Sequence, residues 1–584
     1  MTTPAIVRIA GSLVEARPLR ASLYELAYVG DRSLLGEVIR QTEDLATLQV
    51  YEDTTGLSLG EPVAVTGSTL AVTLGPGLLG SILDGVGRPL ARVAEGTGDF
   101  ISPGVRAETL DHTQRWPFTA QVIPGTAVQG GDVLGVVPER PGIDHRILVP
   151  PGVRGVVKQL VSGEYAVDEA IGELEDGTLL FLSQRWPVRA PRPSAARLSA
   201  ERPFITGQRV FDLLFPVAEG GACVVPGGFG TGKTIVQQSL AKFADADVVV
   251  YVGCGERGNE MTDVLTEFPA LVDPRTGRPV MDRAVLIVNT SNMPVAAREA
   301  SIYLGVTVAE YYRDMGYRVA LMVDSTSRWA EALRELGARL QEMPGEEGYP
   351  TYLASRLGQF LERAGRVTAL GAPTRQGAVT IIGAISPPGG DFSEPVTQAS
   401  LRVAGAMWAL DASLAHQRHY PAVDWDTSFS LYAARVSPWF AEHGGEDWEL
   451  LRSSLIRLLQ RERELRDIAS LVGPEALEDK DKLVMDVAAM VRETILRQNA
   501  FHPHDAFSTI AKTYALAAAA VRLHRSAAAA LERGTPLARL ELAPVRRAIA
   551  AVRDGADRDV ASLAVAAVAA ADGVLPPTAG GTSR

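Results

Sequence analysis

The sequence predicts an α/β multidomain protein with an N-terminal β-barrel, an inserted β-rich module, a domain built on a mainly parallel sheet and a C-terminal helical domain. Three observations lead to this prediction: short alternating apolar segments near the start, apolar strands alternating with helical patterns in the middle, and helical periodicity after about residue 431. With 584 residues, the chain is too long for a single hydrophobic core, so several domains are expected.

The N-terminal part is predicted to consist mostly of β-strands. Residues 1–73 contain short apolar segments, such as Ala5 to Ile9 and Ala46 to Tyr51, that are interrupted by Gly, Asp and Thr. This pattern is typical of a small β-barrel or sandwich. Residues 74–114 form a connection into residues 115–188, where glycines and prolines punctuate further strand-like segments and indicate an inserted β-rich module.

The remaining chain divides into a part with alternating strands and helices and a helical part. In residues 189–430, apolar segments that are expected to be buried strands alternate with helical patterns, which predicts a mainly parallel sheet covered by helices. These segments are 248–252, 284–289, 319–323 and 378–385. Residues 431–584 are predicted to be a helical domain with an Ala-rich stretch at 514–531 and a mobile tail at 576–584.

Composition and charge exclude several classes of protein. No run of about 18 apolar residues could span a bilayer, and the start lacks a secretory signal, which favours a cytoplasmic location. The two cysteines, Cys223 and Cys254, form no disulfide framework and are interpreted as small core residues. The net charge of -12 argues against a broad nucleic-acid-binding surface, so no nucleic-acid partner is expected.

Residues 222–243 predict a strand, a glycine-rich turn and a helix in immediate succession. Glycines let backbone N–H groups turn inward around a polyphosphate, while the following helix presents its positive N-terminal end to the same anion. Lys233 is expected to reach the outer phosphates, and the Thr234 hydroxyl is expected to bind Mg²⁺. The predicted phosphate-binding loop comprises Gly227, Gly228, Phe229, Gly230, Thr231, Gly232, Lys233 and Thr234.

Two acidic residues end predicted strands after this loop. Asp324 closes the apolar string VALMVD, and Glu256 closes YVGCGE. Carboxylates at such strand ends face the ligand crevice of a parallel sheet, so Asp324 is expected to support a metal ion and Glu256 to orient an attacking water. Arg257 would contact the phosphate or pair with an acid. Taken singly, Asp324 could be a helix cap and Glu256 a surface residue that opens a helix.

Several long strings of this chain carry a family resemblance. They are GGFGTGKT, YVGCGERGNEM, MVDSTSRWAEALRE, EMPGEEGYPTYLASRLGQFLERAGRV, ISPPGGDFSEPVTQ and PAVDWDTSFS. Together they resemble the catalytic A (alpha) subunit of the V/A-type rotary ATPases and ATP synthases, and the resemblance extends over nearly the whole chain. The β-rich insertion near 115–188 also resembles the insertion that separates A subunits from the related F-type β subunits.

The resemblance implies a function and a set of site residues. The expected activity is ATP hydrolysis or synthesis in a P-loop, RecA-like domain, with ATP or ADP as substrate and Mg²⁺ as cofactor, coupled to proton or sodium transport. Lys233 and Thr234 would bind phosphate and Mg²⁺, Glu256 would activate water, Arg257 would contact phosphate and Asp324 would support the metal. Phe501 matches the adenine contact of the family, although an aromatic residue beside proline also suits core packing. Arg328 would orient Glu256 or phosphate, or form a structural ion pair.

The resemblance also implies partners. Three A subunits would alternate with three non-catalytic B subunits around a central stalk, held by a peripheral stalk and joined to a membrane-embedded ion-translocating sector. The chain would then be a peripheral protein at the cytoplasmic face of the membrane. Two alternatives remain open: a homohexameric ATPase such as a secretion or RNA-translocating motor, and a nucleotide-binding structural subunit that no longer hydrolyses ATP.

Overall fold

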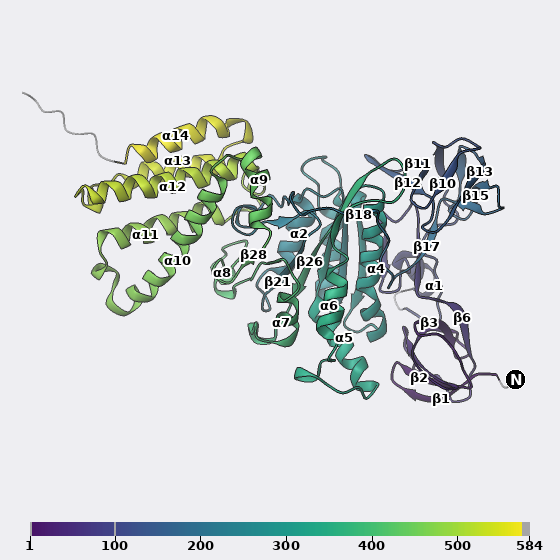
Figure 1. The fold of residues 1–584 in the computed structure, drawn as a ribbon. Helices are drawn as coiled ribbons and strands as arrows, with labels where there is room; N and C mark the ends of the chain where they lie inside the picture. The colour runs from purple at the N-terminus through teal and green to yellow at the C-terminus, as the bar shows by residue number, and fades with distance from the viewer. Residues whose placement is uncertain (1–2, 99–100, 575–584) are drawn as a thin grey trace, which may run out of the picture. The chain divides into compact units, whose positions relative to one another are not determined.

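The computed structural model describes residues 3–98 and 101–574, which divide into two compact units (Figure 1). The first unit comprises Met1–Ser199, Glu219–Val224 and Ala246–Ala404; the second comprises Ala200–Ala218, Val225–Asp245 and Gly405–Arg584. The mobile tail predicted at 576–584 lies outside the described residues. The predicted residue boundaries of the domains remain a prediction.

The N-terminal strands of the first unit form an antiparallel barrel, which Figure 1 views nearly end-on. The strands occur in the order β1-β2-β5-β4-β3-β6. A bridge between Ala5 and Pro62 links the first and last strands, and small and β-branched side chains such as Val14, Ala27 and Val38 fill the interior with no exposed surface. The bounds are β1 Ala5–Ala10, β2 Leu13–Arg17, β3 Glu25–Val29, β4 Leu34–Thr42, β5 Leu45–Val50 and β6 Val63–Thr69.

The β-rich module lies between two strands that pair with each other. β7 (Ala71–Leu74) and β17 (Gln184–Pro187) are antiparallel, so the chain leaves and returns at one place. Within the module, the sheet orders are β10-β13-β15-β16 and β12-β11-β9-β14. The bounds are β9 Trp116–Ala120, β10 Ala127–Gln129, β11 Val133–Arg140, β12 Ile143–Leu148, β13 Arg154–Leu160, β14 Gly163–Tyr165, β15 Ala170–Leu174 and β16 Leu179–Phe181.

A parallel sheet forms the centre of the first unit. Its strands lie in the order β26-β24-β22-β23-β8, each parallel to the next, and β25 extends it antiparallel to β26. Every residue of β22 is buried, because helices such as α4 pack on a sheet whose strands are apolar on both faces. The strand bounds are β8 Ile82–Asp84, β22 Val248–Glu256, β23 Ala284–Thr290, β24 Arg318–Asp324, β25 Gly365–Thr368 and β26 Gln376–Ile385.

Helices of the first unit follow the sheet strands in sequence and cover the sheet. α4 contacts β22, β24 and β26, and α5 contacts β22 and β26. Cys254 on β22 and Cys223 on β21 (Ala222–Pro226) are both buried, as expected for small core residues. The helix bounds are α1 Leu90–Thr97, α3 Gly258–Ala270, α4 Val295–Asp314, α5 Thr326–Arg339, α6 Leu353–Leu361 and α7 Pro395–Leu401.

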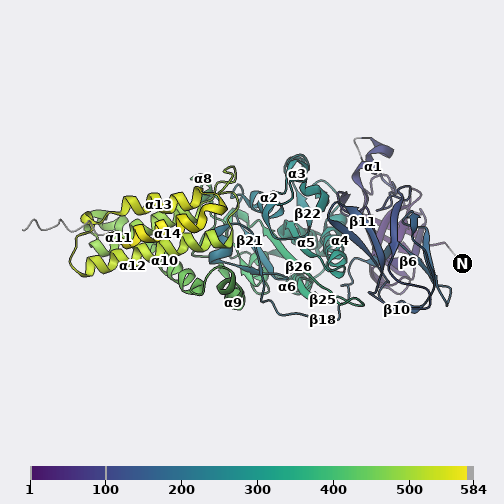
Figure 2. The same cartoon turned by 90° about the horizontal axis from the view of Figure 1, so that it is seen from above.

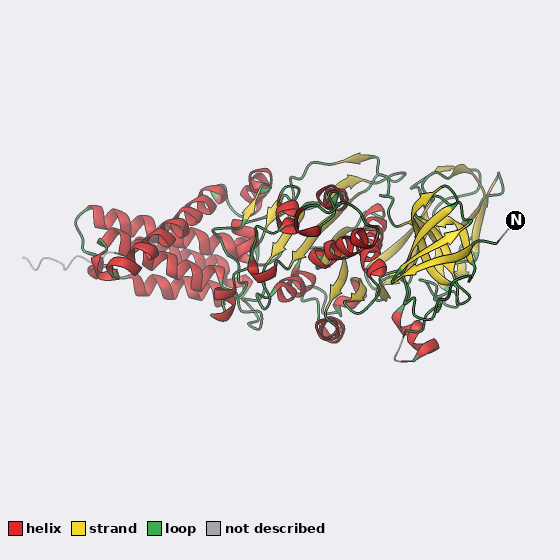
Figure 3. Cartoon of the chain, turned by 90° about the horizontal axis from the view of Figure 1, so that it is seen from below, coloured by secondary structure: helices red, strands yellow, loops and turns green. Residues whose placement is uncertain are grey.

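The second unit is mainly helical (Figure 3). Its long C-terminal helices lie side by side in a bundle (Figure 2), and the buried Trp448 ring stacks on Phe440 with 4.5 Å between centroids. The bounds are α2 Lys233–Phe243, α8 Ala412–His416, α9 Ala433–His443, α10 Trp448–Val472, α11 Asp479–Met490, α12 Ile510–Glu532, α13 Leu542–Asp554 and α14 Val560–Asp572. The short strands β27 (Ala406–Met407) and β28 (Phe429–Ser430) pair antiparallel.

Candidate active site

The predicted phosphate loop forms a turn that only glycine accommodates at several positions. The loop follows β21 and ends where α2 begins at Lys233. Gly230 and Gly232 have φ of 74° and 90°, in the left-handed region. A Cβ atom at Gly227 would lie 2.5 Å from the Thr231 hydroxyl oxygen. The N–H groups of the first turn of α2, which have no partner within the helix, therefore lie directly after the loop.

Polar groups of the loop itself hold its lysine. The Lys233 ammonium donates to the carbonyls of Gly227 at 2.7 Å and Gly228 at 2.9 Å. The Thr231 hydroxyl also donates to the Gly228 carbonyl at 2.9 Å, and this threonine is buried, whereas Phe229 is 80% exposed. A bound polyphosphate would replace the two carbonyls as acceptor of the Lys233 ammonium, because a charged acceptor forms the stronger hydrogen bond.

The first unit brings together Glu256 and Asp324, the two acids predicted at strand ends. They terminate the adjacent parallel strands β22 and β24, where Gly253 is in register with Asp324. Both carboxylates are buried, with 6% and 3% of the residue exposed. The Ser325 hydroxyl donates to Glu256 Oε1 at 2.8 Å, and the Tyr251 hydroxyl donates to Asp324 Oδ2 at 3.3 Å. The alternative of an exposed glutamate that opens a helix is therefore wrong for Glu256.

The surroundings of Glu256 make it a weaker acid. Burial first, and then the neighbouring Asp324 charge, raise the pKa of Glu256 to about 7, while the Ser325 hydrogen bond and the Arg328 charge oppose this rise. A carboxylate with a pKa near neutrality can accept a proton from water and release it within one cycle.

The two arginines predicted near Glu256 have different positions. Arg328 Nε lies 3.8 Å from Glu256 Oε1, and the same guanidinium donates to Glu331 at 2.8 Å, so it serves both as a neighbour of the candidate base and as half of an ion pair. Arg257 is exposed and occupies the N-cap position of α3, directly after Glu256.

Phe501 is not a core residue, because its side chain is 97% exposed on a loop of the second unit. That loop starts beside Tyr420, an aromatic residue that sequence reasoning missed. The Gln498 N–H donates to the Tyr420 carbonyl at 2.8 Å, and the Tyr420 ring lies 3.4 Å from the position of a Cβ at Gly232. The signal in the sequence was an aromatic residue directly before PAVDWD, but nothing local links it to the phosphate loop.

The residues suit a metal ion that is shared with a nucleotide. Among residues 3–98 and 101–574, no group of three or more His, Cys, Asp or Glu side chains gathers as a metal-binding cluster. Mg²⁺ commonly keeps several waters and takes only one or two protein ligands besides phosphate oxygens. A buried aspartate and a threonine hydroxyl at a phosphate loop are donors of that kind.

None of the described helices is both long and apolar enough to cross a bilayer.

Models of known protein families match successive segments of the chain. The ATP synthase alpha/beta family nucleotide-binding domain matches residues 207–430, and its beta-barrel domain matches residues 6–67. The ATP synthase alpha/beta subunit barrel-sandwich domain matches residues 107–189, and the C-terminal domain of V and A type ATP synthase matches residues 437–540. The predicted fold class, with a β-barrel, a β-rich insertion, a nucleotide-binding domain and a helical C-terminus, is confirmed.

Individual relatives are similar over most of their length. The V-type ATP synthase alpha chain of Anaeromyxobacter dehalogenans is 58% identical over 533 residues, which cover 91% of this chain and 92% of the relative. The A subunit of the A-type ATP synthase of Methanopyrus kandleri is 55% identical over 538 residues, covering 91% of each chain.

A solved structure shares the fold. The assembled type III secretion ATPase EscN from enteropathogenic E. coli superposes with a TM-score of 0.63 over 89% of this chain and 100% of that one, at 22% identity. At this identity the likeness concerns the fold alone.

The family models and the relatives together show that the chain belongs to the ATP synthase alpha/beta family. Within it, the chain is one of the alpha (A) subunits of V- and A-type ATP synthases, nucleotide-using enzymes that couple ATP hydrolysis or synthesis to ion transport as part of a larger complex.

Proposed function

We propose that this chain performs the catalytic step through the residues that its sequence singles out. The phosphate loop from Gly227 to Thr234 binds the polyphosphate, Phe501 and Tyr420 contact adenine, and Arg257 contacts phosphate. Glu256 orients the attacking water. The observation that carries the proposal is the buried Glu256 carboxylate at a strand end, with a pKa of about 7 and a hydrogen bond from Ser325.

The chemistry follows from charge. As the terminal phosphoryl group transfers to water, negative charge develops on its oxygens, and Lys233 and the loop N–H groups stabilise this charge. Mg²⁺, held by the Thr234 hydroxyl and supported by Asp324, would add neutralising charge when bound. Glu256 holds the water in line and accepts its proton.

The same proposal extends to the assembly. The chain alternates with a non-catalytic B subunit in a ring of three A and three B, and an arginine from the B subunit completes each site. Central and peripheral stalks join the ring to a membrane-embedded ion-translocating sector, so the chain lies at the cytoplasmic face of the membrane as a peripheral subunit. The helical C-terminal domain acts as the lever that moves the central stalk when nucleotide closes the site.

The test is ATP hydrolysis by this chain alone and after reconstitution with its B and central-stalk subunits. Glu256→Gln keeps the shape of the side chain but removes the base, so turnover of the assembled complex should fall about 10²- to 10⁴-fold while nucleotide binding persists. Glu267→Gln, at an exposed position on α3, is the matched control and should keep full turnover.

Each outcome has a distinct meaning. Turnover that requires assembly and is lost in Glu256→Gln supports the proposal. Equal turnover by the isolated chain would favour a self-contained homohexameric motor, and unchanged turnover of Glu256→Gln would remove Glu256 from its role. Absence of turnover from every preparation would favour a structural subunit.

A further inference from the structure

The first unit contains a cavity that is separate from the candidate catalytic residues. Its volume is about 340 Å³, at the lower end of the range of small-molecule sites. The wall combines the residues after β5, the turn after β8 and the segment from the end of β23 into α4. The polar side chains that matter below are Glu52, Asp53, Asp84, Arg88 and Asn289.

Asn289 makes the cavity unusual. This residue is fully buried, and within the described part of the chain neither its Oδ1 nor its Nδ2 has a hydrogen-bond partner. Its Nδ2 lies 3.0 Å from the position a Cβ would take at Gly85, another lining residue. A buried amide without partners is destabilising, so such a group in a cavity wall indicates a ligand that supplies the missing partners.

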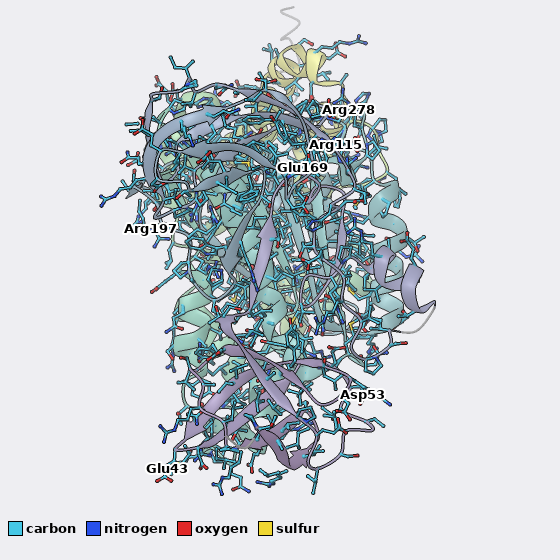
Figure 4. All side chains as sticks on the ribbon, turned by 90° about the vertical axis from the view of Figure 1, so that its right-hand side faces the viewer. Glu43, Asp53, Arg115, Glu169, Arg197 and Arg278 are labelled. Atoms are coloured by element: carbon cyan, nitrogen blue, oxygen red, sulfur yellow. The ribbon has the colours of Figure 1, made fainter. Side chains whose placement is uncertain are left out.

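The charges of the wall favour a cation. Glu52 and Asp84 are buried, and Arg88 bonds Asp84 at 2.7 Å and lies 3.6 Å from Glu52. Asp53 adds a third carboxylate at an exposed position on the barrel (Figure 4). The wall therefore carries three carboxylates and one guanidinium. The first turn of α4 lines the same cavity, but a helix N-terminus contributes only about half a positive charge.

The other end of the ligand must satisfy Asn289. The amide Nδ2 and the first turn of α4 offer N–H donors, which require an acceptor oxygen, while Asn289 Oδ1 requires an N–H donor. A carboxamide group provides both. A bare divalent cation does not suit the cavity, because a cation offers no acceptor for the unpartnered Asn289 Nδ2.

We propose that this cavity binds a small organic cation that carries an amine or guanidinium at one end and a carboxamide at the other. The cationic end lies toward Asp53 and Glu52, and the carboxamide pairs with Asn289. The site is distinct from the residues assigned to ATP chemistry and does not depend on those assignments.

The experiment is calorimetric titration of the nucleotide-free full-length chain with argininamide, lysinamide and glycinamide, and with agmatine, which has the two cationic groups but lacks the carboxamide. We expect argininamide or lysinamide to bind with a Kd below about 10 mM, and agmatine to bind about tenfold more weakly than argininamide. Mg²⁺ alone and inorganic phosphate should not compete.

Three variants locate the binding. Asn289→Leu removes both polar atoms of the side-chain amide, so it should abolish probe binding. Without probe, it should leave the Tm unchanged or raise it. Asp53→Asn should weaken binding, while Asp176→Asn should not; both aspartates are exposed and accept the N–H of a threonine two residues later. The pair Asp53→Asn and Asp176→Asn tests the site even where Asn289→Leu does not fold.

Several results would overturn the proposal. They are the absence of binding by all three amides, equal affinity for agmatine and argininamide, competition by Mg²⁺ or phosphate, or binding that Asp53→Asn and Asp176→Asn change equally. In the first case, the cavity would hold only solvent.

Discussion

Glu256 combines two properties that a surface glutamate lacks: it is buried beside a second carboxylate, and a serine hydroxyl holds it in one orientation. Burial and the Asp324 charge raise its pKa to about 7, and the Ser325 hydrogen bond is the strongest of the opposing effects. Because the ionised form must accept the proton of water, activity should rise with pH through this pKa.

Ser325→Ala should therefore move the acidic limb of the pH–rate profile to higher pH. Removing the hydroxyl takes away an interaction that favours the ionised carboxylate, so the pKa of Glu256 rises further. Relative turnover should fall more at about pH 6.5 than at about pH 8.5, which lie on either side of the pKa. The measurement is kcat/KM of the assembled complex across pH. A limb that stays in place, or moves to lower pH, would mean that another group controls it.

Phe501 is the second residue whose exposure carries information. An apolar ring that is 97% exposed contributes almost nothing to the core, so its value lies in what it can contact. Phe501→Ala should leave the Tm within experimental error but weaken ATP binding by the equivalent of about 1–3 kcal/mol, the range for stacking of a base on an aromatic ring.

The control for Phe501 is Leu471→Ala, in the same unit. Leu471 is 86% exposed at the end of α10, so its truncation also spares the core. Equilibrium binding of a fluorescent ATP analogue by the full-length chain distinguishes the two variants. Equal affinities would show that Phe501 does not contact the base.

At the scale of elements, the end of β22 depends on a glycine. Gly255 has a φ of 71°, and a Cβ there would lie 2.7 Å from Arg298 Cδ and 2.8 Å from Arg328 Cβ. The adjacent strand also limits movement, because the Ser291 N–H donates to the Glu256 carbonyl at 2.8 Å. The strand end can therefore place Glu256 correctly only while position 255 has no side chain.

Gly255→Ala should displace Glu256 and lower turnover at least about tenfold, since the strained backbone alone costs on the order of 1–3 kcal/mol. Gly258→Ala is the matched substitution, because a Cβ at Gly258 would meet open space and its φ lies outside the left-handed region. Turnover of both assembled variants, with circular dichroism to confirm folding, gives the comparison. Similar losses in both would contradict a specific requirement at Gly255.

The sequence predicts a feature when the residues that form it are close together in the chain, and misses it when they are far apart. The phosphate loop is recognisable because its glycines and Lys233 are consecutive, and Glu256 because it ends an apolar strand. Tyr420 and the cavity at Asn289 escape such reasoning, since each depends on segments far apart in the chain. Asp426 likewise has its partner far along the chain, because it pairs with Arg463 on α10 at 2.9 Å.

At the scale of the whole molecule, a buried polar network joins the inserted module to the central sheet domain within the first unit. His145 of β12 bonds Glu139 of β11 at 2.7 Å, and its other ring nitrogen lies 2.8 Å from the Tyr311 hydroxyl on α4. The Tyr312 hydroxyl also donates to Glu139 at 3.2 Å. Burial alone would raise the pKa of Glu139, but His145 and the backbone N–H groups of Leu79 and Gly77 together outweigh it, so the net pKa is lowered.

Glu139→Gln should destabilise the first unit by about 1–3 kcal/mol, because it removes the buried carboxylate that bonds His145 and Tyr312. A lowered carboxyl pKa stabilises the fold above the pKa of the unfolded chain, and this stability is lost as pH falls through the lower folded value. The wild type should thus lose stability on acidification, and the variant should lose less. Glu169→Gln is the control within the same module, since it breaks the exposed pair with Arg115 (Figure 4), which contributes little to stability because water screens it. Urea unfolding at neutral and acidic pH measures the stability of each variant and its pH dependence, and limited proteolysis reports on residues 115–188. Equal stability of the two variants would show that the buried network does not hold the module in place.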